Sequence, residues 1–268
     1  MKTLRPERAD DADEIRALIM EEWRARRVLS PFFAQIVPAE GRSCLYYLQT
    51  WHEGATLQRM LDTDLHFTVA DCVRHGVRLL KGLSSLHRLD IVHRDIKPAN
   101  IHIGRDGNLR ILDLGVAVSL SEDEANAGNP GTPSFMAPEL FSGEEAVAAH
   151  DLYAAGVTLY HLLTRKYPYG EVEPFQHPKF GEPVVPTRFR PDIPGWLENV
   201  LLKSVSKDPR QRFETAEEFL LALERGANRP VSRPRVTPLA MRNPVLTWRI
   251  IAGVSLALNL VLLMMLMR

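Results

Sequence analysis

Four side chains in the middle of the sequence have types and spacing suited to binding and orienting a phosphate group during its transfer. Asp95 stands five residues before Asn100 and eighteen before Asp113, and Lys97 follows Asp95 by two. Carboxylate and amide oxygens are the ligands that Mg²⁺ prefers, and a lysine can neutralise negative charge on a phosphoryl group. Phosphoryl transfer asks for positioning and charge rather than covalent chemistry, and these residues are of the types that a metal-assisted transfer site needs.

The motifs that hold these residues resemble the catalytic core of a protein kinase. They are Ile91-Val-His-Arg-Asp-Ile-Lys-Pro-Ala-Asn100, then Leu112-Asp-Leu-Gly115, then Ala137-Pro-Glu139, and their order and spacing agree with that family. The resemblance implies that Asp95 accepts the proton of the substrate hydroxyl and that Lys97 neutralises the transferring phosphate. Each motif alone also occurs in ordinary loops and turns, so the prediction depends on their combination.

The same resemblance gives roles to five further side chains of these motifs and of the segment between them. It implies that Asn100 and Asp113 bind Mg²⁺ and, through the metal, ATP. His93 is expected to pack inside the fold, and Arg94 is the kind of residue that binds a phosphorylated loop. Thr132 is similar to the threonine that in serine/threonine kinases hydrogen-bonds the base and the lysine, which disfavours tyrosine phosphorylation.

The pattern around these residues predicts how they are positioned. Ile101–Ile103 and Leu109–Leu112 flank the turn Arg105–Asn108 as the two strands of a β-hairpin. This hairpin would set Asn100 and Asp113 at neighbouring strand ends.

Upstream, residues Asp10–Val28 read as an amphipathic helix that resembles the regulatory helix of a kinase small lobe. Its predicted apolar stripe consists of Ile15, Leu18, Ile19 and Trp23. The family spacing places Glu21 in an ion pair with the lysine that grips the nucleotide, with Glu22 as the fallback, whereas both could also be solvated helix charges. Lys2 is the candidate for that lysine.

The rest of the small lobe is expected to be incomplete. Phe33–Val37 and Cys44–Thr50 read as strands, and Thr50-Trp-His-Glu-Gly54 resembles the hinge at which the adenine of ATP would hydrogen-bond to backbone groups, with Trp51 as the candidate residue. The sequence has no Gly-x-Gly-x-x-Gly, so we expect an N-terminally truncated sheet of about three strands with an exposed edge. A downstream start codon, a truncated gene and a loss of catalysis each remain open as the reason.

The large lobe carries two further carboxylates that the resemblance assigns to structure. Val69–Leu86 keeps helical spacing and leads into the catalytic loop. Asp151 opens the apolar run Leu152–Leu163, where it either holds the backbone of the catalytic loop, as in the family, or serves as an N-cap. Arg212 is similar to the arginine that pairs with the glutamate of Ala-Pro-Glu, here Glu139.

Charge and hydropathy are uneven along the chain. The 33 basic and 33 acidic residues cancel, yet no acidic residue follows Glu224. Ile250–Met267 is uncharged and long enough to predict a transmembrane helix, and the arginines before it place the preceding residues in the cytoplasm by the positive-inside rule. Cys44 and Cys72, the only cysteines, are expected to be buried apolar groups.

We therefore expect an α+β, protein kinase-like two-lobed fold. Its parts would be a partial small lobe over residues 1–50, a mainly helical large lobe over 51–224, an Arg/Pro-rich linker over 225–245 and a transmembrane helix over 246–267. The chain is also similar, through Glu21–Arg27 and Leu45–Tyr47, to the kinase part of bacterial phosphatase/kinase fusion proteins.

The resulting functional hypothesis is an ATP- and Mg²⁺-dependent serine/threonine kinase on a bacterial inner membrane. Its partners would be proteins with Ser/Thr acceptors and, through the single-pass C-terminal anchor, membrane lipid, but no nucleic acid. The alternative is a catalytically impaired pseudokinase that acts as a membrane-tethered binding scaffold, which the missing glycine-rich motif favours and the Asp95 and Asp113 motifs oppose.

Overall fold

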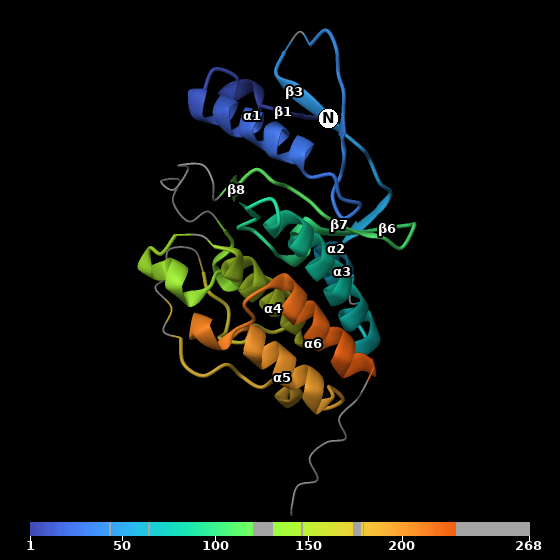
Figure 1. Ribbon diagram of the computed structural model, residues 1–268, viewed down its shortest axis with the longest axis vertical. Coiled ribbons are helices and arrows are strands. Elements are labelled where there is room, and N and C mark those ends of the chain that lie inside the picture. Colours follow the sequence, from blue (N-terminus) through green and yellow to red (C-terminus); the bar gives the residue numbers. More distant parts are fainter. Residues whose placement is uncertain are drawn as a thin grey trace, which may run out of the picture. The chain divides into compact units, whose positions relative to one another are not determined.

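The computed structural model describes residues 1–228, except for residues 43, 64, 120–130, 146, 174–177 and 179. This part of the chain forms a small lobe of one long helix and a sheet, followed by a larger, mainly helical lobe (Figure 1). The strands are β1 (Lys2–Thr3), β2 (Ile36–Val37), β3 (Tyr46–Gln49), β4 (Gly54–Thr56), β5 (Ile91–Val92), β6 (Ile101–Gly104), β7 (Leu109–Ile111) and β8 (Val118–Ser119). The helices are α1 (Ala12–Arg27), α2 (Leu57–Asp62), α3 (Val69–His87), α4 (Ala148–Thr164), α5 (Gly195–Ser204) and α6 (Ala216–Asn228).

Helix α1 forms where the sequence predicts it but buries a different face. It begins after Asp11, whose carboxylate accepts two backbone N–H groups of the first turn. Its buried residues are Leu18, Glu21 and Arg24, whereas Ile19 and Trp23 are 47% and 38% exposed. The predicted apolar stripe was therefore wrong in part, because the helix turns Leu18 and its ion-pairing glutamate, rather than Ile19 and Trp23, toward the rest of the fold.

The small sheet has three antiparallel strands in the order β1-β3-β2, and its strands are shorter than predicted. Phe33, expected in a strand, instead makes an isolated bridge with Ile111 of the large lobe and is buried there. Cys44 is exposed, so the expectation that both cysteines are buried was wrong for this one. Cys44 precedes β3 in an irregular segment, whereas Cys72 lies inside α3 and is buried.

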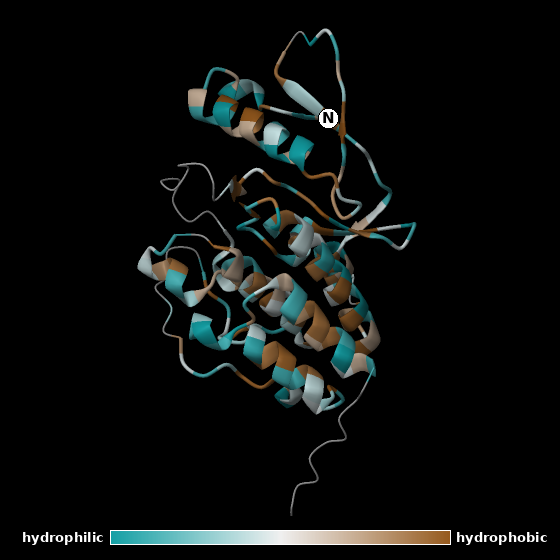
Figure 2. Ribbon diagram, in the orientation of Figure 1, coloured by the Kyte–Doolittle hydropathy of each residue, from teal (hydrophilic) through white to brown (hydrophobic). Residues whose placement is uncertain are grey.

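The large lobe is built around α3 and α4. Helix α3 begins with a reciprocal capping box between Thr68 and Asp71, which fixes its first turn. Fourteen of the seventeen residues of α4 are buried, so this helix forms the centre of the lobe and packs against α3 and α5. Figure 2 shows hydrophobic residues recurring along α3, α5 and α6 between hydrophilic ones, the pattern of helices with one buried face.

The predicted hairpin is present and positions the catalytic segment. Strands β6 and β7 pair antiparallel with Ile101 opposite Ile111, and β4 extends them to the order β4-β6-β7. Gly107, at positive φ, closes the turn. Asn100 therefore directly precedes one strand, and Asp113 lies two residues beyond the end of its partner.

Gly54 allows β4 to approach β6 closely. Its φ is +154°, and a Cβ at this position would collide with the carbonyl oxygen of Ile103. We expect Gly54→Ala to lower the free energy of unfolding by about 1–3 kcal/mol, since the backbones would have to separate. Denaturant unfolding measures this. The control is Gly195→Ala, where the added Cβ meets nothing within 4 Å, and an equal loss in both variants would contradict the expectation.

The C-terminal part of the sequence lies largely outside the described residues. Helix α6 continues to Asn228, past the predicted end of the large lobe at residue 224. The predicted linker beyond that helix and the predicted transmembrane segment Ile250–Met267 are not among the described residues. Within the described part, every helix is too short or too polar to cross a bilayer.

Candidate active site

The Asp95 carboxylate is held by three side chains at the centre of the candidate site. Lys97 Nζ lies 2.7 Å from Asp95 Oδ2, and Asn100 Nδ2 donates to the same oxygen at 2.8 Å. The Thr132 hydroxyl accepts a hydrogen bond from Lys97 Nζ at 2.7 Å and donates to Asp95 Oδ1 at 3.4 Å. The carboxylate is thus fixed in orientation, with Lys97 beside it, as a proton acceptor for a positioned hydroxyl requires.

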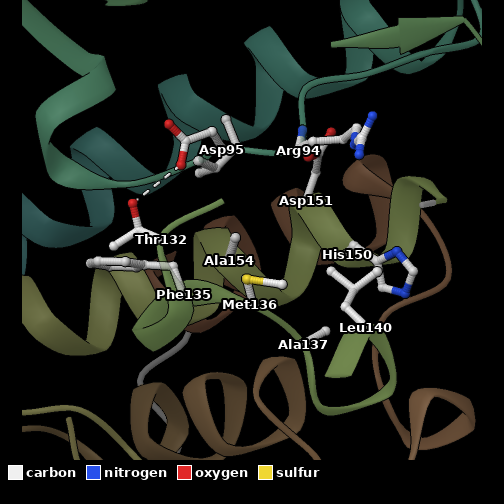
Figure 3. A pocket seen from close by; sticks show the side chains of 11 residues that line it. Arg94, Asp95, Thr132, Phe135, Met136, Ala137, Leu140, His150, Asp151 and Ala154 are labelled. Carbon is white, nitrogen blue, oxygen red and sulfur yellow. Dashed lines mark hydrogen bonds between the residues drawn. The ribbon is translucent and has the colours of Figure 1, made fainter. Parts of the chain in front are cut away.

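Below Asp95, the segment after Thr132 packs against the catalytic loop. Figure 3 shows Thr132 and Asp95 pointing toward each other, with Phe135 and Met136 beneath them. The cavity enclosed here is about 20 Å³, room for roughly one water molecule. This contact therefore fixes the segment under the catalytic loop.

Asp151 supports the catalytic loop from inside the large lobe. It is 1% exposed, and its carboxylate accepts the backbone N–H groups of His93 at 2.8 Å and Arg94 at 2.9 Å. Val147 is the N-cap of α4 and Asp151 lies inside the helix, so the N-cap alternative was wrong. Arg94 has a φ of +69°, a strained conformation that these bonds hold in place.

Histidines complete this support. The His87 Nε2 lies 2.9 Å from Asp151 Oδ2. Burial alone would raise the pKa of Asp151, but the hydrogen bond and charge of His87, with the other donors, bring it below the usual value. His93 Nδ1 accepts from Asp95 N at 3.3 Å, so its Nε2 carries the proton and donates to Leu112 O at 3.0 Å. His93 therefore ties the catalytic loop to the segment before Asp113.

Asp113 presents a half-exposed carboxylate. Its φ is +64°, its side chain is 53% exposed, and its Oδ1 accepts from Gly115 N at 3.0 Å and from Lys2 Nζ at 2.9 Å. A Cβ on Gly115 would lie 2.9 Å from that oxygen, so a larger residue there would displace the carboxylate. Asn100 uses its Nδ2 on Asp95, which leaves its Oδ1 as an oxygen ligand. One carboxylate and one amide oxygen fit a Mg²⁺ ion that completes its shell with phosphate and water.

Lys2 forms an ion pair with Glu21 rather than with Glu22. Lys2 Nζ lies 2.5 Å from Glu21 Oε1, and Glu21 is 4% exposed. Glu22 instead binds Arg42 with both oxygens, and the hydrogen bonds from Arg42 and Arg26 outweigh burial and lower its pKa to about 2. Burial would lower the pKa of Lys2, but Glu21 and then Asp113 outweigh it and raise the pKa, so the amine stays cationic between two carboxylates.

The predicted hinge residue Trp51 points into solvent. Trp51 is 87% exposed, so only its main chain could contact an adenine ring from this position. The hinge itself is fixed on both sides, because Thr50 N donates to Gln35 O and Glu53 O accepts from Arg105 N, each at 2.8 Å. The role of Trp51 stays a prediction.

Glu139 and Arg212 form a buried pair. Arg212 donates to both carboxylate oxygens, at 2.6 and 2.8 Å, and His150 Nε2 lies 3.1 Å from Glu139 Oε1. Burial would raise the pKa of Glu139, but the His150 and Arg212 hydrogen bonds bring it to about 2. The pair joins the Ala137–Glu139 motif to the loop before α6.

The lowered pKa of Glu139 predicts acid sensitivity. A carboxylate whose pKa falls on folding adds stability above its unfolded pKa of about 4.5 and loses it as the pH drops to about 2. We expect the free energy of unfolding to fall by at most about 3 kcal/mol through this group between pH 5 and pH 2. Urea unfolding across this range should show a smaller pH dependence in Glu139→Gln. An unchanged slope in that variant would contradict the expectation.

Comparison with known proteins agrees with this geometry. Residues 1–221 match the family model described as protein kinase domain. The chain belongs to the protein kinase domain family. The kinase fold accounts for the hairpin that sets Asn100 beside Asp113 and for the pairing of Lys2 with the small-lobe helix.

Several curated bacterial relatives are similar to this kinase domain. A probable serine/threonine-protein kinase of Streptomyces coelicolor is 32% identical over 67% of this chain and 28% of its own length. The serine/threonine-protein kinase PrkC of Bacillus subtilis is 31% identical over 82% of this chain and 35% of its own length. The serine/threonine-protein kinase PknB of Mycolicibacterium smegmatis is 31% identical over 65% of this chain and 29% of its own length. The chain thus spans about a third of the length of these relatives.

The structure brings the predicted residues into two groups joined by the hairpin. Asp95, Lys97, Asn100 and Thr132 form one, and Lys2, Glu21 and Asp113 form the other. Sequence reasoning missed His87 and His150, which each bind a buried carboxylate. The one available signal was that His150 directly precedes Asp151, and a lone histidine at a helix start does not reveal a partner eleven residues upstream.

Proposed function

We propose that the chain is an ATP-dependent protein kinase that transfers the terminal phosphate to serine or threonine hydroxyls. The observation that carries the proposal is the geometry at Asp95, where Lys97 and Thr132 share one hydrogen-bonded group with the carboxylate. In serine/threonine kinases a threonine hydrogen-bonds both the base and this lysine, and Thr132 makes the same two contacts. The relatives named as serine/threonine kinases add support.

In this proposal each residue has one task. Asp95 accepts the proton of the substrate hydroxyl and aims its oxygen, while Lys97 offers positive charge where the phosphoryl group passes. Asn100 and Asp113 would hold Mg²⁺, which when bound neutralises the phosphate oxygens of ATP. Lys2 already contacts Asp113, and its amine can reach phosphate oxygens placed beside that carboxylate.

Replacing Lys2 tests the nucleotide end of the site. We expect Lys2→Met to lower kcat/KM for ATP by about 10- to 100-fold, because a charge-assisted hydrogen bond to phosphate is lost and Glu21 is left without its cation. Steady-state kinetics with varied ATP measures this. Lys203→Met is the matched control, since Lys203 pairs with Glu218 on the exposed surface of the large lobe. Equal kcat/KM values in the two variants would argue against the role of Lys2.

The experiment for the activity itself uses the purified chain with γ-labelled ATP, Mg²⁺ and a generic protein substrate. Label in phosphoserine or phosphothreonine after acid hydrolysis supports the proposal, and label in phosphotyrosine alone contradicts the choice of acceptor. A folded chain that transfers no label and binds no ATP would favour the scaffold alternative.

We also propose that Ile250–Met267 anchors the chain in a membrane with the kinase domain on the cytoplasmic side. The support is the uncharged run itself and the arginines that precede it. The expected result is that the expressed protein sediments with membranes and resists alkaline extraction. Leu258→Arg combined with Leu260→Arg should release it, because each charge at mid-helix costs about 2.5–3.5 kcal/mol on insertion. Release of the unmodified protein at alkaline pH would contradict the anchor.

A further inference from the structure

One end of the large lobe gathers four helix ends. At this end α3 begins, α4 finishes, α5 begins and α6 finishes. Helix α6 runs antiparallel to α3, with Gly76 against Leu223, and Gly226 near its end lies against Trp196 of α5. Figure 1 shows the start of α3 beside the end of α6. The last described residue, Asn228, therefore lies at this end of the lobe.

Two arginines fix the loops between these helix ends. Arg190 Nη1 donates to Phe67 O at 3.0 Å and to Leu163 O at 3.2 Å, and so joins the segments before α3, at the end of α4 and before α5. Arg165 Nη2 donates to Leu65 O at 3.1 Å. These hydrogen bonds hold the loops together as one continuous surface between the helix ends.

This surface combines exposed apolar side chains with cations. We call it the basal surface and define it by Leu65, Arg165, Arg188, Phe189 and Arg225. Leu65 is 48% and Phe189 40% exposed. Among the described acidic side chains of the adjoining segments, Asp192 forms an ion pair with Arg190 and Asp62 accepts a hydrogen bond from Gln58. The five residues of the basal surface combine three arginines with two apolar tips.

The sequence that follows this surface has the same chemistry. Residues 229–249 contain five arginines and no acidic residue, and they precede the uncharged run Ile250–Met267. A proline-containing segment of this length reaches at most about 65 Å, so an anchored kinase domain would stay close to the bilayer. Such a tether raises the effective concentration of the basal surface at the bilayer, so that even a weak contact with lipid is populated.

We propose that the basal surface rests on anionic membrane lipid, with Leu65 and Phe189 entering the headgroup region and the arginines contacting lipid phosphates. The inference rests on the proposed C-terminal anchor. Apolar tips ringed by arginine suit the boundary between headgroups and acyl chains, and each arginine near an anionic leaflet strengthens the contact by about fivefold. The contact would hold the large lobe with one fixed end toward the bilayer.

The test uses the full chain in vesicles of phosphatidylcholine alone or mixed with phosphatidylglycerol. In a Cys44→Ser background, an environment-sensitive fluorophore is placed on Ala70→Cys, an exposed position at the start of α3 that leaves the basal surface intact, or on Leu29→Cys as control. We expect a blue shift at residue 70 only in the anionic vesicles, reversed by high salt, and none at residue 29. Identical spectra at residue 70 in both vesicle types would overturn the proposal.

Charge variants separate the basal surface from the rest of the molecule. Arg188→Gln with Arg225→Gln should weaken the anionic-lipid response by about 10- to 30-fold in lipid concentration, while Arg5→Gln with Arg16→Gln, two exposed small-lobe arginines, should leave it unchanged. Equal effects of the two pairs would overturn the assignment.

Sedimentation with the neutral vesicles reports on the anchor separately. If the chain does not sediment with neutral vesicles, the anchor proposal fails, and the basal surface is then judged by sedimentation with anionic vesicles in the same two pairs of variants. If only the variant with Arg188→Gln and Arg225→Gln stops sedimenting, the role of the basal surface is supported. If that variant still sediments, the role is overturned.

Discussion

Asp95→Ala is expected to lower the rate of phosphate transfer by about 10²- to 10⁴-fold, the contribution typical of a positioned proton acceptor. The carboxylate bonds only to Lys97, Asn100 and Thr132 in the described structure, and these bonds orient it rather than carry the fold. ATP binding should change by less than about threefold, since Lys2 and Asp113 form a separate group. Single-turnover kinetics together with equilibrium ATP binding separates the two effects.

One further variant and one control test this prediction. Asp95→Asn keeps the shape of the side chain and should lose nearly as much activity as the alanine variant, because an amide does not accept the proton. Asp10→Ala removes a carboxylate from an exposed position before α1 and should keep full activity. If Asp95→Asn retained more than about a tenth of the rate, the role given to Asp95 would be wrong.

Arg212→Leu is expected to lower the free energy of unfolding by about 3–5 kcal/mol, because it leaves a buried carboxylate without its bidentate partner. Arg212 is 3% and Glu139 8% exposed, and Arg212 also donates to Ser206 O at 2.7 Å. The expected fall in Tm is roughly 6–20 °C for a lobe of this size. Calorimetric or circular-dichroism melting measures it.

The neighbouring chain offers a matched control for this variant. Arg210 lies two residues away, its side chain is 92% exposed, and it pairs with Asp208 at the surface. Arg210→Leu should change stability by less than about 0.5 kcal/mol. Combining Arg212→Met with Glu139→Gln should restore part of the loss, since no unpaired charge is then buried. Equal losses in the Arg210 and Arg212 variants would contradict this account of the pair.

The parts of the site that could be predicted from the sequence depend on short separations. Asp95, Lys97 and Asn100 lie within one loop, and the alternation of apolar residues on either side of an Arg-Asp-Gly-Asn turn fixes how the hairpin carries Asn100 toward Asp113. The pairing of Lys2 with Glu21 came from family spacing, and the local sequence alone could not separate Glu21 from Glu22, because both stand on the same helix and both are charged.

What the sequence did not reveal depends on packing between distant segments. Ile19 and Trp23 are apolar, yet they stay exposed because α1 turns Leu18 and Glu21 inward. His87 and His150 bind carboxylates that a local pattern cannot locate, since His87 and Asp151 are 64 residues apart. Cys44 is exposed because it lies outside β3, and no propensity of cysteine could have placed it there.

Calorimetric titration of the folded chain with ATP, with and without Mg²⁺, tests the central claim most directly. The account predicts saturable ATP binding that weakens by about tenfold or more when Mg²⁺ is chelated, and equally when Asp113→Asn removes the carboxylate offered to the metal. ATP binding that is the same with and without Mg²⁺, or that is absent from a chain shown to be folded, would contradict it.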